Sequence, residues 1–130
     1  MNKKLWLFAL VVPVTAIILF LPLTPTKIEE EPVPEPLATL RPALVPVCAC
    51  ESEQGKNGVP SQFNEDGSVR FGHINPLDTG MCQINQKYHL AKAVELGYNI
   101  FTEQGNIKYA NYLYDREGLT PWNWSKKCWQ

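Results

Sequence analysis

Two carboxylates of this chain lie at points where the sequence changes character. Glu51 belongs to the stretch CACES (48–52) at the end of a short predicted helix, and Asp78 opens the strand-like stretch DTGMCQIN (78–85). Glycoside hydrolysis needs two acidic groups in one cleft: a neutral one to protonate the leaving oxygen, and an ionised one to stabilise or trap the sugar cation. The pair therefore predicts a glycosidase site with Glu51 and Asp78 as catalytic residues.

The position of Glu51 also predicts a raised pKa. The residue lies in the last turns of its helix, where the negative end of the helix dipole disfavours an ionised carboxylate. A carboxyl group with a raised pKa is a candidate proton donor. The simpler interpretation of this helix taken alone is a solvated glutamate beside Ser52.

The elements that must position the pair begin with a short helix and a small sheet. Pro46 suits the first turn of the helix, and Gly55 and Gly58 would end it. Residues 62–72 contain a hairpin loop, EDGS, followed by alternating apolar and other side chains, which predicts a small antiparallel sheet. The stretch 81–84 is predicted to return as a short strand or extended segment.

Two amphipathic helices are predicted to cover the core. The first runs from about residue 86 to 96, with Asn85 as its cap and Gly97 at its end. The second runs from about residue 103 to 117, with Gly118 beyond its end. The expected fold class is therefore α+β, mainly α, with a small antiparallel β-hairpin sheet beside the cleft.

The N-terminal part differs in composition from the rest. Residues 1–23 contain an uncharged stretch about long enough to span a bilayer, so a membrane anchor is favoured over a cleaved signal. The lysines before this stretch predict that the rest of the chain lies outside the cytoplasm, membrane-anchored, or secreted if the segment is cleaved. Residues 24–47 are rich in Pro and Glu and predict a linker, so the folded domain is expected to span residues 48–130.

Charge and cysteine content argue against several functional classes. Residues 48–130 contain eight Lys or Arg and nine Asp or Glu, so no nucleic-acid partner is expected. There is no Gly-rich phosphate loop, and no cofactor is expected. A metal site is less favoured because the C-x-C pair has no second closely spaced pair. Two disulfides formed in an oxidising compartment are expected from the four cysteines, Cys48, Cys50, Cys82 and Cys128.

Four motifs occur in a characteristic order. They are C-E-S at the end of a helix, D-x-G-x-x-Q-I-N after a hairpin, N-I-x-Y-A-x-x-L on a later helix, and G-L-x-P-W followed by a cysteine. In this order they resemble the lysozyme superfamily, including the c-type lysozymes and the lytic transglycosylases with a soluble-lytic-transglycosylase-type domain. The resemblance extends over residues 48–129 and none of the first 47.

The resemblance implies a lysozyme-like domain that cleaves the bond between N-acetylmuramic acid and N-acetylglucosamine in peptidoglycan, as a lytic transglycosylase or a muramidase. It implies that Glu51 is the general acid and base. Asp78 falls where c-type lysozymes keep their second carboxylate, which the transglycosylases usually lack. The implied partners are peptidoglycan glycan strands and, through the N-terminal helix, the membrane, for a chain expected to be a monomer. Residues implied in substrate binding are Gln83, Asn85, Tyr109 and Trp122.

The chain departs from the c-type pattern in two ways. The stretch between the two carboxylates is longer, and Cys82 replaces an apolar residue. Carboxylates about 5 Å apart would favour a retaining hydrolase, and a separation of about 6.5–9.5 Å an inverting one. An Asp78 that points away would favour a transglycosylase with Glu51 as sole acid and base, which leaves an anhydro end.

The disulfide pairing is partly constrained by geometry. Cys48 and Cys50 project about 200° apart on one helix, so they should not bond to each other. In c-type lysozymes the acid-bearing helix is bonded to a cysteine near the C-terminus. The resemblance therefore implies the pairs Cys50–Cys128 and Cys48–Cys82.

Two other functions fit the sequence less well. One is a non-catalytic glycan-binding module that keeps the cleft without turnover. The other is a thiol-redox or metal protein built on the C-x-C pair. His73 and His89 are predicted to be surface or packing residues rather than catalysts, and Trp122 and Trp124 fit the core as well as they fit a sugar-stacking role.

Overall fold

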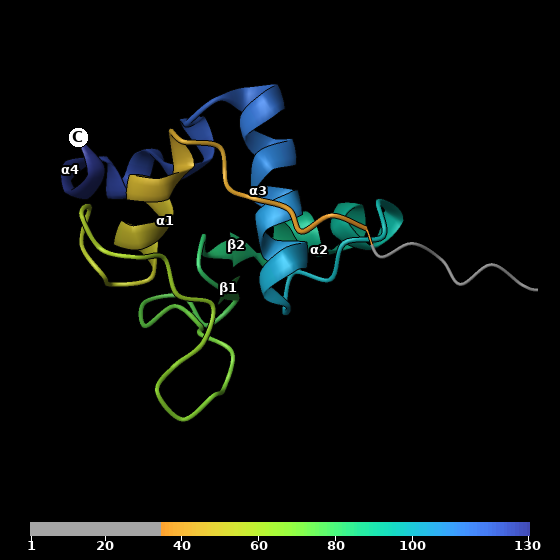
Figure 1. The fold of residues 1–130 in the computed structure, drawn as a ribbon, viewed down its shortest axis with the longest axis horizontal. Helices are drawn as coiled ribbons and strands as arrows, with labels where there is room; N and C mark the ends of the chain where they lie inside the picture. Colours follow the sequence, from red (N-terminus) through yellow and green to blue (C-terminus); the bar gives the residue numbers. More distant parts are fainter. Residues whose placement is uncertain (1–34) are drawn as a thin grey trace, which may run out of the picture. The chain divides into compact units, whose positions relative to one another are not determined.

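The structure of the chain is a computed structural model that describes residues 35–130 (Figure 1). Its elements are helices α1 (Leu44–Glu51), α2 (Gln86–Glu95), α3 (Glu103–Glu117) and α4 (Lys126–Trp129), the 3-10 helix η1 (Thr120–Ser125), and strands β1 (Asp78–Thr79) and β2 (Ile84–Asn85). The fold is α+β and mainly helical with a small antiparallel sheet, as predicted. The predicted membrane anchor lies outside the described residues. Within residues 35–130, no helix combines the length and apolar character that crossing a membrane requires.

The folded part of the chain begins before residue 48, inside the segment predicted to be a linker. The backbone N–H of Arg41 donates to Asn111 Oδ1 at 2.9 Å, and the Arg41 guanidinium pairs with Asp115 at 2.8 Å. The segment before α1 therefore lies along α3, as Figure 1 shows. Its composition predicted a tether because the segment has no apolar periodicity. Nothing in the sequence indicated that it packs, since its partners on α3 lie about 70 positions away.

Helix α1 is almost entirely apolar, and four of its eight residues are buried. Pro46 lies in its first turn, as predicted. The helix ends at Glu51, before the glycines that were expected to end it. Its end is stabilised by the buried Ser52, whose hydroxyl donates to Cys48 O at 2.8 Å and accepts from Ser61 N at 3.1 Å.

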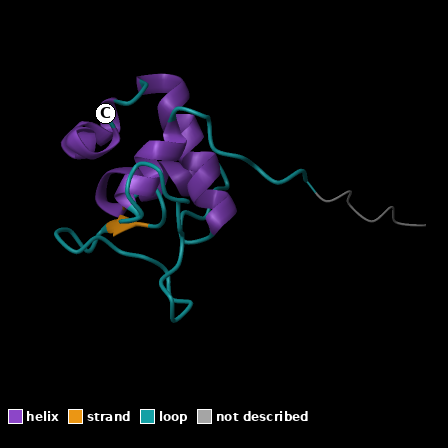
Figure 2. Cartoon of the chain, turned by 60° about the vertical axis from the view of Figure 1, so that its left-hand side comes forward, coloured by secondary structure: helices purple, strands orange, loops and turns teal. Residues whose placement is uncertain are grey.

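The sheet is smaller than the sequence pattern predicts. Strands β1 and β2 pair antiparallel, with Asp78 opposite Asn85. The predicted hairpin is reduced to a single antiparallel bridge between Phe63 and Val69. The stretch 81–84 is mostly a turn, and its last residue alone joins β2. Figure 2 shows the short sheet beside the long loops that precede it.

The turn 80–83 connects β1 to β2 through backbone conformations that a strand does not contain. Gly80 has a φ of 77° and Gln83 a φ of 46°, both in the left-handed region. A Cβ at Gly80 would lie 2.3 Å from Asn106 Nδ2, so only glycine fits there. The prediction of a strand or extended segment over 81–84 was therefore wrong for residues 81–83 and right only for Ile84, because an apolar pattern carries no information about positive φ.

Helices α2 and α3 agree with their predicted bounds to within one residue. Asn85 caps α2, and its Oδ1 accepts the N–H of Lys87 at 3.1 Å. Thr102 caps α3 with its side chain. Gly97 and Gly118, both with positive φ, follow the two helices. These signals lie within a few residues of each helix end, so the local sequence is sufficient to specify them.

Two disulfides join α1 to the rest of the fold. Cys48 bonds to Cys82 in the turn, and Cys50 bonds to Cys128 in α4, which confirms the predicted pairing. Each bridge stabilises the domain by about 2–4 kcal/mol. The core around them contains the buried residues Leu44, Val47, Met81, Ile84, Ala93, Ile100, Ile107, Tyr109, Ala110, Leu113, Trp122 and Trp129.

Two buried amide side chains hold the turn in place. Asn106 on α3 is fully buried; its Oδ1 accepts Cys82 N at 3.1 Å, and its Nδ2 donates to Thr79 O at 2.9 Å. Gln62 is also buried, and its Oε1 accepts Met81 N at 2.9 Å. The strands are only two residues long, so side chains satisfy turn backbone groups that a sheet ladder does not reach.

We expect Asn106→Leu to destabilise the domain by about 3 kcal/mol or more, because it leaves several buried backbone groups without a partner. The matched control is Asn111→Leu on the same helix. Asn111 also bonds to backbone groups, at Arg41 and Thr39, but these are exposed, so water replaces the bonds and the loss stays below about 1 kcal/mol. Urea unfolding with the disulfides intact measures both values. Equal losses would contradict a special role for the buried amide.

Candidate functional site

Glu51 and Asp78 line one cleft of about 350 Å³. Glu51 comes from the C-terminal end of α1 and Asp78 from the start of β1, so the disulfide between α1 and the turn helps to set their relative position. Five of the six residues predicted for catalysis or binding line this cleft, namely Glu51, Asp78, Gln83, Asn85 and Trp122. The other residues that line it are Asn75, Ile84, Tyr88, His89, Leu113, Pro121 and Trp124.

A second hollow of about 240 Å³ adjoins the cleft. The two hollows share Glu51, Asn75, Asp78 and Gln83. The carboxylates therefore lie in the middle of a groove that continues on both sides of them. Such a groove suits an extended chain molecule, because it provides binding surface on either side of a bond held at the carboxylates.

Glu51 is half-buried, and three effects act on the pKa of its carboxyl group. Burial raises the pKa and is the largest effect; a hydrogen bond from Ser125 Oγ lowers it, and the charge of Asp78 raises it again, so the net direction is upward. The raised pKa agrees with the sequence-based prediction. Its main physical cause is burial, whereas the helix dipole was the cause expected from the sequence.

Asp78 is held by two amide side chains. Its Oδ1 accepts from Asn85 Nδ2 at 2.6 Å and from Asn75 Nδ2 at 3.2 Å. The other end of the Asn85 amide caps α2. Asn85 was predicted to bind substrate, but its contacts give it a structural role in holding the carboxylate. Asn75 was not identified from the sequence, although an Asn two residues before Leu77 is typical of an Asx turn: its Oδ1 accepts the N–H of Leu77 at 3.2 Å, while its Nδ2 reaches Asp78.

Gln83 lies between the two hollows. Its Nε2 donates to Gly80 O at 2.8 Å, which fixes the side chain across the turn. A Cβ at Gly72 would lie 2.8 Å from Gln83 Oε1 and 2.6 Å from Asn75 O, so glycine at position 72 leaves room for this arrangement. The amide of Gln83 therefore faces the groove at a fixed position, as expected for a polar group that binds sugar substituents.

The aromatic residues of the cleft divide into a buried wall and an exposed rim. Trp122 is buried, and its Nε1 donates to Cys82 O at 2.9 Å, so it forms part of the wall. Trp124 is fully exposed and Tyr88 is 71% exposed, and both line the cleft. Exposed aromatic rings at a cleft can stack on the faces of sugar rings. Tyr88 was missed in the sequence, although it lies in the first turn of the helix whose cap holds Asp78.

Tyr109 does not line the cleft, in contrast to the prediction that it binds substrate. It is 1% exposed, and its hydroxyl lies 3.2 Å from His89 Nδ1. His89 does line the cleft, and burial lowers the pKa of its imidazole, an effect that Glu117 partly opposes. His89 was predicted to be a surface or packing residue, because a lone histidine on a helix gives no signal of its tertiary neighbours.

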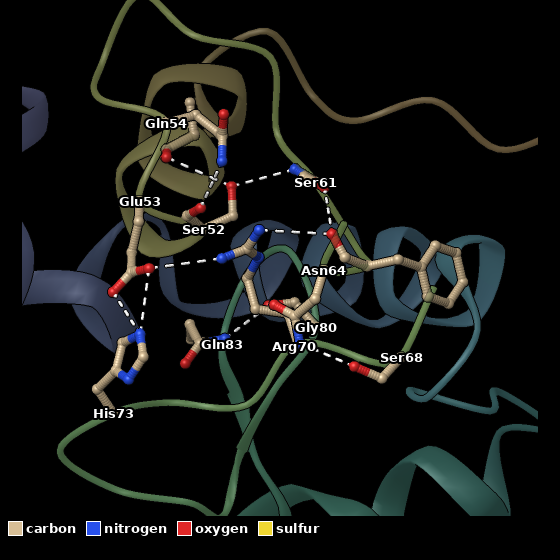
Figure 3. Close-up of polar contacts among 12 residues, drawn as sticks. Ser52, Glu53, Gln54, Ser61, Asn64, Ser68, Arg70, His73, Gly80 and Gln83 are labelled. Atoms are coloured by element: carbon tan, nitrogen blue, oxygen red, sulfur yellow. Dashed lines mark hydrogen bonds and ion pairs between the residues drawn. The ribbon is translucent and has the colours of Figure 1, made fainter. Parts of the chain in front are cut away.

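A charged cluster lines part of the second hollow. Figure 3 shows Glu53 between His73 and Arg70, with 3.1 Å between Glu53 Oε1 and His73 Nε2 and 3.5 Å between Glu53 Oε2 and Arg70 Nη1. Glu53 has a φ of 64°, and it follows α1 almost directly after Glu51. The cluster connects the end of the helix that carries Glu51 with the loop that forms the wall of the second hollow.

Among residues 35–130, no group of three or more His, Cys, Asp or Glu side chains is arranged to hold a metal ion. All four cysteines are bonded, and Cys48 and Cys50 have different partners. Comparisons with protein-family models, with curated proteins and with solved structures found no match for this chain.

We expect the carboxyl pKa of Glu51 to respond in opposite directions to two substitutions. Ser125→Ala removes the hydrogen bond that lowers this pKa, so the pKa rises further. Asp78→Asn removes the charge that raises it, so the pKa falls. Carbon-detected NMR titration of the Glu51 carboxyl in the folded protein measures both changes. A change in the same direction for both variants would contradict this electrostatic account.

The raised pKa also makes the free energy of unfolding depend on pH. Because the pKa of Glu51 is higher in the folded state than in the unfolded state, the folded protein keeps its proton between the two values. Stability therefore falls as pH rises through that interval, and Glu51→Gln removes this fall. Urea unfolding of both proteins across the interval should show the variant gaining stability relative to the wild type as pH rises. A constant difference would be inconsistent with the raised pKa.

Proposed function

We propose that this chain is a cell-wall glycosidase with a lysozyme-like fold, which cleaves the bond between N-acetylmuramic acid and N-acetylglucosamine in peptidoglycan. The observation that carries the proposal is the half-buried Glu51, whose pKa is raised, beside Asp78 in the middle of a groove. A carboxyl group whose pKa is raised, next to a second acidic side chain, is the combination that glycoside cleavage requires.

The proposed reaction begins with proton donation by Glu51. Its proton passes to the glycosidic oxygen as the bond from that oxygen to the anomeric carbon breaks, and the leaving sugar departs as an alcohol. The positive charge that develops on the remaining sugar faces Asp78, whose carboxylate is held by Asn75 and Asn85. Stabilisation of this charge by a preorganised carboxylate lowers the barrier.

Two routes complete the reaction, and in both the Glu51 carboxylate acts as the base. It can accept a proton from a water molecule whose oxygen bonds to the anomeric carbon, which gives the hydrolysis product of a muramidase. It can instead accept the proton of the sugar's own 6-hydroxyl, whose oxygen closes on the same carbon. The second route gives the anhydro end of a lytic transglycosylase, with no water consumed.

The lining of the groove supports a carbohydrate ligand. Tyr88 and Trp124 offer exposed rings for stacking, and the Gln83 amide offers a fixed polar group for an N-acetyl or hydroxyl substituent. A glycan strand, rather than a single sugar, fits a groove that continues past both carboxylates. The proposed partner is therefore a peptidoglycan strand, and the chain is proposed to act as a monomer.

The fold and the disulfides support the proposed family and location. A helix that ends at the acid, a small sheet that carries the second carboxylate, and later helices that cover the core follow the order expected of a lysozyme-like domain. Disulfides persist in oxidising compartments, which favours a location outside the cytoplasm. Together with the uncharged stretch in residues 1–23, this favours a membrane-anchored chain, or a secreted one if that segment is removed.

We expect Glu51→Gln to reduce the cleavage of purified glycan strands by about a thousandfold, because it removes the proton donor. The matched control is Glu53→Gln, which removes one negative charge from the same groove at an exposed position and should keep most of the activity. Mass spectrometry of the released fragments is the assay, and near-ultraviolet circular dichroism checks the fold.

An active Glu51→Gln variant would end the proposal. A wild-type chain that binds strands but releases no reducing or anhydro ends would identify a non-catalytic glycan-binding module instead. In an active chain the product mass separates the two routes, because an anhydro end is lighter than a hydrolysed end by one water.

A further inference from the structure

We propose that a hollow beyond Trp124 binds the anionic peptide stems carried by N-acetylmuramic acid, so that the chain favours peptide-bearing glycan strands over denuded ones. This inference rests on the proposed function and extends it to the form of the substrate. The hollow measures about 450 Å³. It is lined by Asn123, Trp124, Lys126, Lys127 and Gln130, none of which takes part in the proposed bond cleavage.

Trp124 connects this hollow, here called the lysine hollow, to the cleft. Its fully exposed side chain lines both the cleft that contains Glu51 and the lysine hollow. A sugar ring stacked on the Trp124 indole would lie between the two hollows. One side of the ring would face the carboxylates, and the substituents on its other side would face the lysines. The peptide of a muramic acid residue is attached to the ring through such a substituent, so a strand bound in the cleft would bring its peptide to this position.

The charge of the lysine hollow is positive. Lys126 and Lys127 are exposed, and neither takes part in any of the ion pairs found in the described part of the chain. Lys56 contributes a third ammonium group at the border, where its Nζ donates to Gln130 O at 3.2 Å. Residues 48–130 contain slightly more acidic than basic residues, so this local excess does not follow from the overall charge.

Carboxylates on a flexible peptide match this arrangement. Stem peptides carry side-chain and terminal carboxylates, and lysine ammonium groups bind carboxylates through charge-assisted hydrogen bonds without a fixed approach geometry. Anionic lipid headgroups would satisfy the same charges. A membrane lying against Trp124 would, however, cover the rim of the cleft, so the shared tryptophan favours the peptide of a bound strand.

The test compares strands with intact stem peptides and the same strands after an amidase has removed the peptides. Binding is measured with full-length chains carrying Glu51→Gln, which prevents cleavage, and kcat and KM are measured with the native acid. The test variant is Lys126→Gln with Lys127→Gln. Its controls are Lys126→Arg with Lys127→Arg, which keeps the charge, and Lys92→Gln with Lys108→Gln, which removes two charges elsewhere.

We expect the Lys126→Gln, Lys127→Gln variant to raise Kd and KM for peptide-bearing strands by about three- to tenfold, with kcat unchanged. Its values for denuded strands should not change, and both control variants should resemble the wild type. The wild-type preference should also weaken at high salt, because exposed charges are screened. A purely structural role for these lysines would change both substrates equally and would show no such dependence on salt.

The outcomes separate this inference from the proposed function. Cleavage of both strands with equal KM in wild type and variant overturns the inference and leaves the function intact. Preferential binding of peptide-bearing strands without any cleavage supports the inference and ends the proposed enzymatic activity. Loss of binding to anionic phospholipid vesicles in the variant, with no preference between strands, overturns the inference in favour of a membrane surface. The vesicle arm uses the excess of binding to anionic over uncharged vesicles, because the N-terminal segment is common to all variants and an anchor would bind both kinds of vesicle.

Discussion

The cleft depends on the hydrogen bonds that the buried amides of Asn106 and Gln62 make to the turn between β1 and β2. Each strand has only two residues, so the sheet ladder alone is too short to hold the turn. The amides supply the missing partners from α3 and from the loop before the sheet, and the cost of leaving buried backbone groups unpaired makes this arrangement specific. The positions of the Asp78, Gln83 and Asn85 side chains in the cleft depend on this turn, because these residues lie in it or in the strands on either side of it.

The disulfides set the position of the acid with respect to both walls of the cleft. Helix α1 has eight residues, too few to be stable alone in water. The Cys48–Cys82 bridge attaches it to the turn that follows Asp78 and β1. The Cys50–Cys128 bridge attaches it to α4, which directly follows Ser125. Glu51 is thereby held between the sheet side and the tail side of the cleft, where burial and the charge of Asp78 raise its pKa.

The two ends of the groove differ in charge. On one side of the carboxylates, Glu53 joins His73 and Arg70 into a compensated charged cluster. On the other side, an exposed tryptophan leads to lysines that form no ion pair within the described residues. The acidic and basic groups are therefore paired at one end, and the lysines lie outside the ion pairs of the described residues at the other.

The sequence by itself determined the features that depend on neighbouring residues. The cap at Asn85 and the glycines after both helices indicated α2 and α3, and the order of motifs indicated Glu51 and Asp78. Only the tertiary structure decided the start of the domain, the exposure of Trp124 and the burial of Tyr109. It also revealed the hydrogen bond from Ser125 to Glu51, which joins residues 74 positions apart. Caps act within one turn of the chain, whereas burial and long-range hydrogen bonds depend on how distant segments pack, which no local pattern specifies.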